Sequence, residues 1–359
     1  MANLGNIEVL LGNYEKGVRL LGLSLDANPD QPLALFSQGI GLQNLGRLNK
    51  ALECYDRAIT LHPDFQEARD CSALLRRSNV GTSPHIQPLD DINRLVHARH
   101  GWFLANRYDF YLGSALIRYG EFSEAEHEFL ASLLGPGDFV IEVGSNIGAH
   151  TIGLAKIVGA SGQIFAIEPQ PAIFRSLCAN LALNSLFNVQ PFACGCGSHR
   201  DTMTVVTAID YSAATAHNSG GVSLSQTGDG IPVSVMPLDE LVGDIPSLRL
   251  IKIDVEGMER EVLLGANGII EKHRPLLYVE NDRLEKSKAL IELIMAAGYR
   301  LWWHIPFFYN PDNYFHVEEN DYPNEASYNM FCQPREAVQP ALSEGLIEIN
   351  DPDFHPLGH

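Results

Sequence analysis

Residues 139–151 read FVIEVGSNIGAHT, an apolar run that breaks at Gly144 and continues as a helical pattern after Gly148. A strand, a glycine turn and the start of a helix in this order are typical of the first unit of an open α/β sheet. A dinucleotide fingerprint has a second glycine inside the turn, where this chain has Asn146. The stretch therefore predicts a ligand crevice at the end of this strand and counts against a nicotinamide cofactor.

Strands and helices alternate beyond this stretch. Apolar runs that predict strands lie at 163–168, 188–194, 249–254, 275–280 and 299–304, with amphipathic segments between most of them. The alternation predicts a doubly wound, mostly parallel α/β sheet. Residues 201–236 interrupt it with Thr- and Val-rich strands around a Gly- and Ser-rich centre. We expect this insertion to cover a substrate.

Composition narrows the class of protein. The 359 residues include 44 acidic and 25 basic side chains, for a net charge of −19. This charge disfavours a nucleic-acid substrate, because it repels phosphates. Neither a membrane-spanning run nor a secretory leader is expected. The six cysteines form no zinc pattern, so we expect reduced thiols and a cytoplasmic protein.

The first 78 residues carry a repeat with a period of 34 positions, a spacing typical of paired helices. The glycines and prolines that define it are Gly5 and Gly39, Gly12 and Gly46, and Pro29 and Pro63. The second copy, PLALFSQGIGLQNLGRLNKALECYDRAITLHP, resembles the tetratricopeptide repeat, with Tyr55 filling the gap beside small residues. The resemblance implies an all-α segment over 1–78 that either binds a protein partner or stabilises the chain. A linker and entry segment follows at 79–105.

Carboxylates stand at the ends of the predicted strands. Glu142 lies inside the first strand, and Glu168 ends the second, 24 residues after Gly144. An acid near this spacing binds ribose hydroxyls in nucleotide-binding sheets. Asp254 ends the fourth predicted strand and Glu280 ends the fifth. Because the carboxyl ends of parallel strands meet at one edge, we expect these acids to share one crevice.

Four segments in this order resemble the FkbM-type, S-adenosylmethionine-dependent methyltransferases: GPGDFVIEVGSNIGAHT, IFAIEPQP, LIKIDVEGMEREVLLGA and PLLYVENDR. The resemblance covers roughly residues 100–335. It implies a class I methyltransferase domain with a seven-stranded sheet over 106–335, a C-terminal tail over 336–359, and O-methylation of a sugar, glycan or secondary metabolite. The cofactor-binding residues that it implies are Glu142, Gly144, Ser145, Asn146, Gly148, Thr151, Glu168, Pro169 and Asp254. Cys194 and Cys196 stand where the family has a small residue and an acid.

Asp254 is the first candidate to orient or deprotonate the acceptor hydroxyl, with Glu280 beside it. His304, at the end of the last predicted strand, is a competing base with an ordinary pKa closer to neutrality. The set Asp254, Glu280 and Asn281 also resembles the metal ligands of catechol-type O-methyltransferases, and oxygen ligands suit Mg²⁺. Alternatively, Asn281 caps the helix that follows. Lys252 either extends to solvent or touches the substrate.

Two other functions stay open at this point. One is an NAD-dependent oxidoreductase on a Rossmann sheet, against which Asn146 counts. The other is a non-catalytic scaffold, in which the repeats bind a partner and the sheet is a relic. Retention of the strand-end acids together with both turn glycines counts against the relic.

Overall fold

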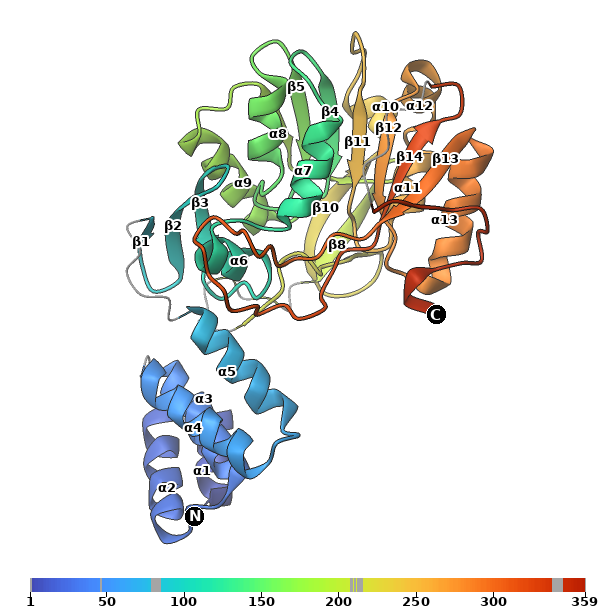
Figure 1. Cartoon of the computed structure of the whole chain (residues 1–359). Coiled ribbons are helices and arrows are strands. Elements are labelled where there is room, and N and C mark those ends of the chain that lie inside the picture. The colour runs from blue at the N-terminus through green and yellow to red at the C-terminus, as the bar shows by residue number, and fades with distance from the viewer. Residues whose placement is uncertain are drawn as a thin grey trace. The chain divides into compact units, whose positions relative to one another are not determined.

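The computed structural model describes residues 2–45, 47–78, 85–206, 209, 211, 216–337 and 345–358. The chain divides into two compact units, residues 1–84 with 214–216 and the remaining residues (Figure 1). No helix within the described ranges is long and apolar enough to cross a membrane.

The N-terminal unit consists of helices packed in sequence order. They are α1 (Ala2–Leu10), α2 (Tyr14–Ala27), α3 (Pro32–Asn44), α4 (Leu48–Leu61) and α5 (Gln66–Ser78). Tyr55 is fully buried, and a Cβ on Gly39 would lie 2.4 Å from its ring. Leu21, 34 positions before Tyr55, packs in the same way on Gly5. The repeat is thus confirmed in three dimensions, while Gly46 lies outside the described residues.

The predicted linker contains a small sheet. Residues 79–84 lie outside the described ranges, and from Ile86 onward the chain forms three antiparallel strands. These are β1 (Ile86–Pro88), β2 (Asn93–Ala98) and β3 (Gly101–Asn106), all within the second unit. The domain limits drawn at 78, 105 and 335 stay predictions.

The main sheet has eight strands in the order β15-β13-β14-β12-β11-β4-β5-β6. The parallel strands are β4 (Phe139–Val143), β5 (Gln163–Ile167), β6 (Val189–Phe192), β11 (Leu250–Ile253) and β12 (Leu276–Glu280). Antiparallel pairing adds β14 (Asn329–Pro334), β13 (Tyr299–His304) and β15 (Ile347–Glu348). The doubly wound, mostly parallel sheet is confirmed. Its eighth strand is the two-residue edge strand β15, which comes from the predicted tail.

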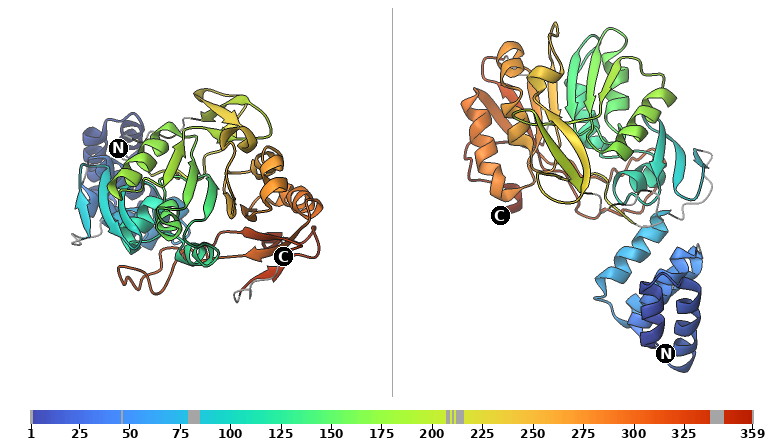
Figure 2. Two further views of the ribbon diagram at one scale, coloured as in Figure 1. Left: turned by 90° about the horizontal axis from the view of Figure 1, so that it is seen from above. Right: turned by 180° about the vertical axis from the view of Figure 1, so that it is seen from behind.

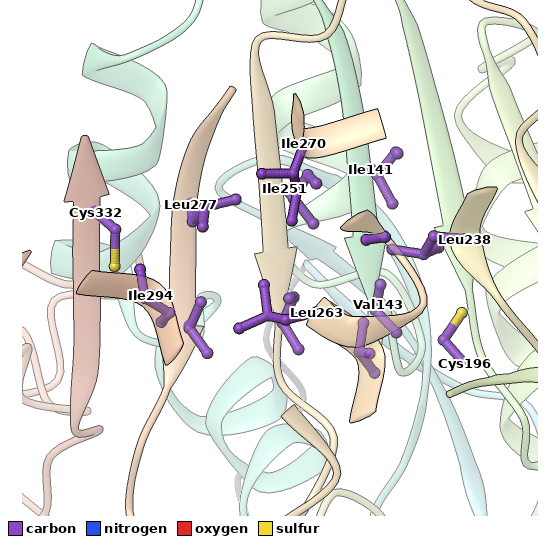
Figure 3. Close-up of a cluster of buried hydrophobic side chains, with 14 of the residues drawn as sticks. Ile141, Val143, Cys196, Leu238, Ile251, Leu263, Ile270, Leu277, Ile294 and Cys332 are labelled. Atoms are coloured by element: carbon purple, nitrogen blue, oxygen red, sulfur yellow. The ribbon is translucent and has the colours of Figure 1, made fainter. Parts of the chain in front are cut away.

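Helices cover both faces of this sheet (Figures 1 and 2). The face that carries Val140, Ile164 and Leu250 packs on α7 (Glu124–Ser132), α8 (Thr151–Val158) and α9 (Pro171–Leu183). The opposite face packs on α10 (Leu238–Leu241), α11 (Glu259–Leu264), α12 (Asn267–His273) and α13 (Leu284–Ala296). Figure 3 shows Ile141 and Ile251 on this second face, with Leu263 from α11. The alternating strand side chains thus bury both faces. Two further short helices are α6 (Leu112–Tyr119) and η1 (Pro356–Gly358).

The insertion forms a separate sheet with the chain that follows β6. Its strands are β7 (Gly195–Cys196), β8 (Asp201–Val206), β9 (Leu224–Ser225) and β10 (Gly230–Met236), in the order β7-β10-β8-β9. The Thr- and Val-rich pattern predicted strands here, and the structure has them. Residues 207, 208, 210 and 212–215 of the insertion lie outside the described ranges.

Candidate active site

A cavity of about 400 Å³ opens where β4, β5, β11 and β12 end. Residues 218, 220–222 and 224 of the insertion form part of the cavity wall. The prediction from sequence is that this insertion covers a substrate. The predicted site residues that line it are Glu142, Gly144, Ser145, Asn146, Glu168, Pro169, Asp254 and Glu280. Four predicted residues are not among its described lining: Gly148, Thr151, Asn281 and His304. The strand-end acids therefore share one crevice.

The turn after β4 depends on its glycines. Gly144 has φ +88°, and a Cβ there would lie 1.8 Å from the carbonyl oxygen of Asp254. The ends of β4 and β11 can approach this closely only without a side chain, because a Cβ would overlap the neighbouring backbone. Gly148 has φ +90°, and a Cβ there would lie 2.9 Å from Leu177. Gly148 thus allows α8 to pack on α9 behind the turn.

Glu168 is 3% exposed, and its carboxylate lies beside the backbone of this turn. Its Oε2 accepts a hydrogen bond from the Asn146 N–H at 3.1 Å, and its Oε1 accepts one from the Gln170 N–H at 2.8 Å. Burial raises the pKa of Glu168 to about 7. Each carboxylate oxygen can accept a further hydrogen bond, so the pair of oxygens suits the two hydroxyls of a ribose.

Glu142 is 1% exposed and reaches the cavity from inside β4. The Thr151 hydroxyl donates a hydrogen bond of 2.5 Å to its Oε2. Burial raises the pKa of Glu142 to about 7, against the opposing effect of Lys252. Thr151 therefore orients Glu142 from behind and does not itself line the cavity.

Lys252 is only 2% exposed, so it does not extend to solvent. Its Nζ lies 2.9 Å from Asp254 Oδ2 and 3.6 Å from Glu126 Oε1. Burial lowers the pKa of Lys252, but Asp254, Glu126 and Glu142 together outweigh burial and raise it. Burial in turn raises the pKa of Asp254, and Lys252 overcomes this and lowers it. Asp254 is therefore an ionised carboxylate held at the cavity by a buried cation.

Glu280 ends β12 beside Asp254, to which it is hydrogen bonded. Burial and then the charge of Asp254 raise the pKa of Glu280 well above its usual value. Its Oε2 is buried without a hydrogen-bond partner among the described residues. The pKa values of the two carboxyl groups are thus shifted in opposite directions, that of Asp254 down and that of Glu280 up.

Asn281 does not join these acids. Its Nδ2 donates to Ser287 Oγ at 2.9 Å and to the sulfur of Met330 at 3.3 Å, and it is 3% exposed. Among the described residues, no group of three His, Cys, Asp or Glu side chains is placed to hold a metal ion. The structure brings together two of the three suggested metal ligands, and a Mg²⁺ site stays a prediction.

The side chain of His304 lies on the face of the sheet that packs on α7, where it contacts Phe129. Its Nδ1 is 2.8 Å from the Tyr278 hydroxyl oxygen, and its ring centre is 4.3 Å from that of Phe129. Burial lowers the pKa of His304. Of the two candidate bases, the structure brings Asp254 and not His304 to the cavity wall.

The lining residues that sequence reasoning missed include Glu126 and His150. The spacing of Ser123 and Glu126 predicted a capping box at the start of α7, but Ser123 makes no capping hydrogen bond to the backbone. Its hydroxyl instead contacts Glu126 Oε2 at 3.3 Å, while Glu126 Oε1 faces Lys252. His150, at the start of α8, lies with its Nε2 3.5 Å from the same Oε1. The buried position of Lys252 explains why Glu126 turns inward.

Cys194 and Cys196 line the cavity near the end of β6. Burial raises the pKa of Cys194 to about 11, and that of Cys196 well above its usual value. Both thiols are therefore neutral at physiological pH. They give this part of the cavity an apolar surface of the kind that a flat aromatic ring can contact.

Comparison with known proteins agrees with this geometry. Residues 142–301 match the model of the methyltransferase FkbM domain, and residues 32–71 match that of the tetratricopeptide repeat. A hexuronic acid methyltransferase, AglP of Haloferax volcanii, is 32% identical over 37% of this chain and 52% of its own. The 31-O-demethyl-FK506 methyltransferase FkbM of Streptomyces tacrolimicus is 31% identical over 37% of this chain and 60% of its own. The chain spans about half to three fifths of the length of the curated relatives it matches.

Among solved structures, methyltransferase FkbM from Methylobacillus flagellatus KT is similar, with 17% identity and a TM-score of 0.36 over 77% of this chain and 65% of that one. The family matches fall on the segments that build the cavity, from Glu142 in β4 to the start of β13. Residues 142–301 therefore match an FkbM methyltransferase domain on a doubly wound, mostly parallel sheet, and residues 32–71 match a tetratricopeptide repeat.

Proposed function

We propose that the protein is an S-adenosylmethionine-dependent O-methyltransferase that modifies a hydroxyl of a sugar, glycan or secondary metabolite. The observation that carries the proposal is the crevice itself, in which Glu168, an ionised Asp254 and a neutral Glu280 meet at the edge of an FkbM-domain sheet. An NAD-dependent reaction fits less well, because a pyrophosphate would face these acids. A scaffold without chemistry would have no need of a buried lysine that keeps Asp254 ionised.

The cofactor would lie along the ends of β4 and β5. Glu168 would accept hydrogen bonds from the ribose hydroxyls, and the turn at 144–146 would face the methionine part. Pro169 and Cys194, which line the cavity, would border the adenine. The acidic lining favours a cationic sulfonium. When bound, S-adenosylmethionine supplies a methyl group activated by the positive charge on sulfur.

Asp254 would act on the acceptor. Its carboxylate would accept the hydroxyl proton as the acceptor oxygen bonds to the methyl carbon and the bond from that carbon to the sulfonium sulfur breaks, leaving S-adenosylhomocysteine. Lys252 favours the ionised form of Asp254 and holds its Oδ2, and the carboxylate lies at the cavity wall, where it would face the hydroxyl. The neutral Glu280 adjoins this pair and limits the negative charge that gathers there.

Calorimetric titration with S-adenosylmethionine, S-adenosylhomocysteine and NAD tests the cofactor. We expect both adenosyl compounds to bind, and binding of NAD alone would overturn the proposal. For the chemistry, Asp254→Asn should lower methyl transfer by about 10²–10⁴ with little change in cofactor affinity. Near-normal turnover of this variant would move the chemistry elsewhere, and loss of wild-type activity with a chelator would assign Asp254 to a metal instead.

The remaining parts of the chain have proposed roles as well. We propose that residues 106–335 form the catalytic domain and that the repeats over 1–78 bind a protein partner. The net charge of −19 argues against a nucleic-acid partner. Removal of residues 1–78 should leave S-adenosylhomocysteine binding intact. A folded but non-binding truncated protein would show that this division of the chain is wrong.

A further inference from the structure

The part of the cavity beyond Asp254 is a compartment with two unlike walls. We call it the acceptor compartment and define it by the lining residues Tyr111, Phe122, Glu126, His150, Asp254, Glu280 and Phe308. All of them belong to the second unit, and they come from segments far apart in the sequence. None was part of the cofactor pattern except Asp254.

One wall is aromatic. The rings of Phe122 and Phe308 stack with their centres 5.6 Å apart, and Tyr111 meets Phe308 edge-on at 5.8 Å. Phe122 also lies 6.1 Å from the ring of His150. Such a wall can contact the apolar C–H face of a sugar or another ring.

The other wall consists of carboxyl groups. Glu126 is 3% exposed and His150 is 7% exposed, yet Glu126 Oε1 and His150 Nδ1 have no hydrogen-bond partner among the described residues. Glu280 Oε2 is unpartnered in the same sense. Glu126 Oε1 has the Lys252 Nζ as an ion-pair partner at 3.6 Å. Buried polar atoms are normally paired, so His150 Nδ1 and Glu280 Oε2 in particular point to a ligand that supplies hydroxyl donors and acceptors.

The charge of this wall restricts the ligand further. Lys252 is the only Lys or Arg side chain in the described lining, and its Nζ is already engaged by Asp254 and Glu126. Burial lowers the pKa of His150 to about 3, so His150 is neutral at physiological pH. The described lining therefore offers a carboxylate or phosphate on the acceptor no free positive partner, while Asp254 would repel it.

We infer that the acceptor compartment binds a hydroxylated ring that is uncharged or carries an amine, and that it excludes rings that carry a carboxylate or phosphate. The inference rests on the proposed function and narrows its substrate class. It also separates this chain from its relative that is named for hexuronic acid. The aromatic wall would hold the face of the ring, and the carboxyl wall would hold its hydroxyl edge.

The test compares two probes of one shape, methyl β-D-glucopyranoside and methyl β-D-glucopyranosiduronate. Binding to the full chain saturated with S-adenosylhomocysteine is followed by ligand-observed NMR titration. We expect the uncharged probe to bind at least about tenfold more tightly, because a buried like-charge contact opposes the uronate. Equal or tighter binding of the uronate overturns the inference, as does binding of neither probe.

A matched pair of variants assigns the effect to the compartment. Glu126→Gln removes one buried carboxyl group from the carboxyl wall, and we expect it to narrow the difference in affinity between the probes at least threefold. Glu128→Gln makes the same change at an exposed position of α7 and should leave the difference unchanged. The same narrowing in both variants would refute the role of Glu126. If S-adenosylhomocysteine itself does not bind, the proposed function fails; if it binds and the uronate is preferred, only this inference fails.

Discussion

Replacing Lys252 with Met tests the central electrostatic feature of the site. Methionine has nearly the length of lysine and fits an apolar position, so the change removes the charge while filling most of the space. The wild-type Nζ lies 2.9 Å from Asp254 Oδ2 and 3.6 Å from Glu126 Oε1. Glu126 is 3% exposed, so water cannot replace the lost cation there.

The expected cost follows from these contacts. At 2.9 Å, a pair of unit charges interacts by about 6 kcal/mol at an effective dielectric constant of 20. Burying the lysine offsets part of this, and Asp254 is 40% exposed, which screens the pair. Breaking a buried pair by removing one partner typically costs about 3–5 kcal/mol. We therefore expect the variant to lose about 3 kcal/mol of stability at pH 8.

The pH dependence of this loss has a definite sign. In the wild type, Lys252 lowers the pKa of Asp254, so that contribution to stability is present above the unfolded pKa and is lost only in strong acid. Burial already raises the pKa of Glu126 in the wild type, and without Lys252 we expect burial to raise it further and to raise the pKa of Asp254 as well. Both groups can then become neutral in mild acid. The deficit of the variant should accordingly shrink between pH 8 and pH 5.

Urea unfolding at both pH values, followed by tryptophan fluorescence, measures this deficit. The three tryptophans, Trp102, Trp302 and Trp303, all lie in the second unit, so the signal does not report on the repeats. Lys288→Met is the control, because Lys288 pairs with Asp353 on the surface and its loss should leave the midpoint almost unchanged. Equal stability of Lys252→Met and wild type at pH 8, or a deficit that grows in acid, would refute the reasoning.

Three further changes probe the cofactor end of the crevice. Gly144→Ala should abolish S-adenosylhomocysteine binding measured by calorimetry, because the new Cβ would lie 1.8 Å from the Asp254 carbonyl oxygen. Gly159→Ala is the control and should retain binding, because a Cβ at that position would meet no atom within 4 Å. Glu168→Ala should weaken the binding of S-adenosylmethionine at least about tenfold, because two charge-assisted hydrogen bonds to the ribose would be lost. An unchanged affinity in a folded variant would exclude the proposed contact between Glu168 and the ribose. Glu142→Gln should gain stability relative to wild type as the pH rises from 4.5 to about 7, because the folded wild type retains a proton there that the unfolded chain releases. At about 1.4 kcal/mol per pH unit, the gain would approach about 3 kcal/mol in urea unfolding, and a gain that appears only in acid would contradict the buried pKa.

Much of the fold follows from local pattern. The strand, glycine turn and helix at 139–151 define β4 and α8, and the period of 34 residues defines the paired helices. β14 was not predicted, although all six of its residues are buried. Its segment follows a long irregular stretch and pairs with β12 and β13, so its place depends on strands distant in sequence. A short apolar run carries no sign of such pairing.

Some site residues could also be predicted from local sequence patterns, whereas others depend on contacts between distant segments. Gly144 and Glu168 stand at fixed positions relative to their strands, so their spacing alone places them at the crevice. Glu126 is different, because S-x-x-E ahead of an apolar period is an ordinary helix start. Only the packing of α7 over the sheet brings its carboxylate to Lys252. Likewise, His304 looked like a base by its ordinary pKa, but the direction of its side chain on β13 takes it to Tyr278.

The pKa values of three buried acids in the crevice are raised by the same physical effect, which is burial. Burial raises the pKa of Glu142, Glu168 and Glu256 to about 7, so each is only partly ionised near neutral pH. Ionised acids in such a place oppose folding, and a ligand that brings positive charge and hydroxyl donors removes that cost. An anionic ligand would not. The acids that lower the stability of the free protein therefore favour the binding of a cationic cofactor. Because cofactor binding offsets the cost of these buried charges, a stable sheet can retain so acidic a crevice.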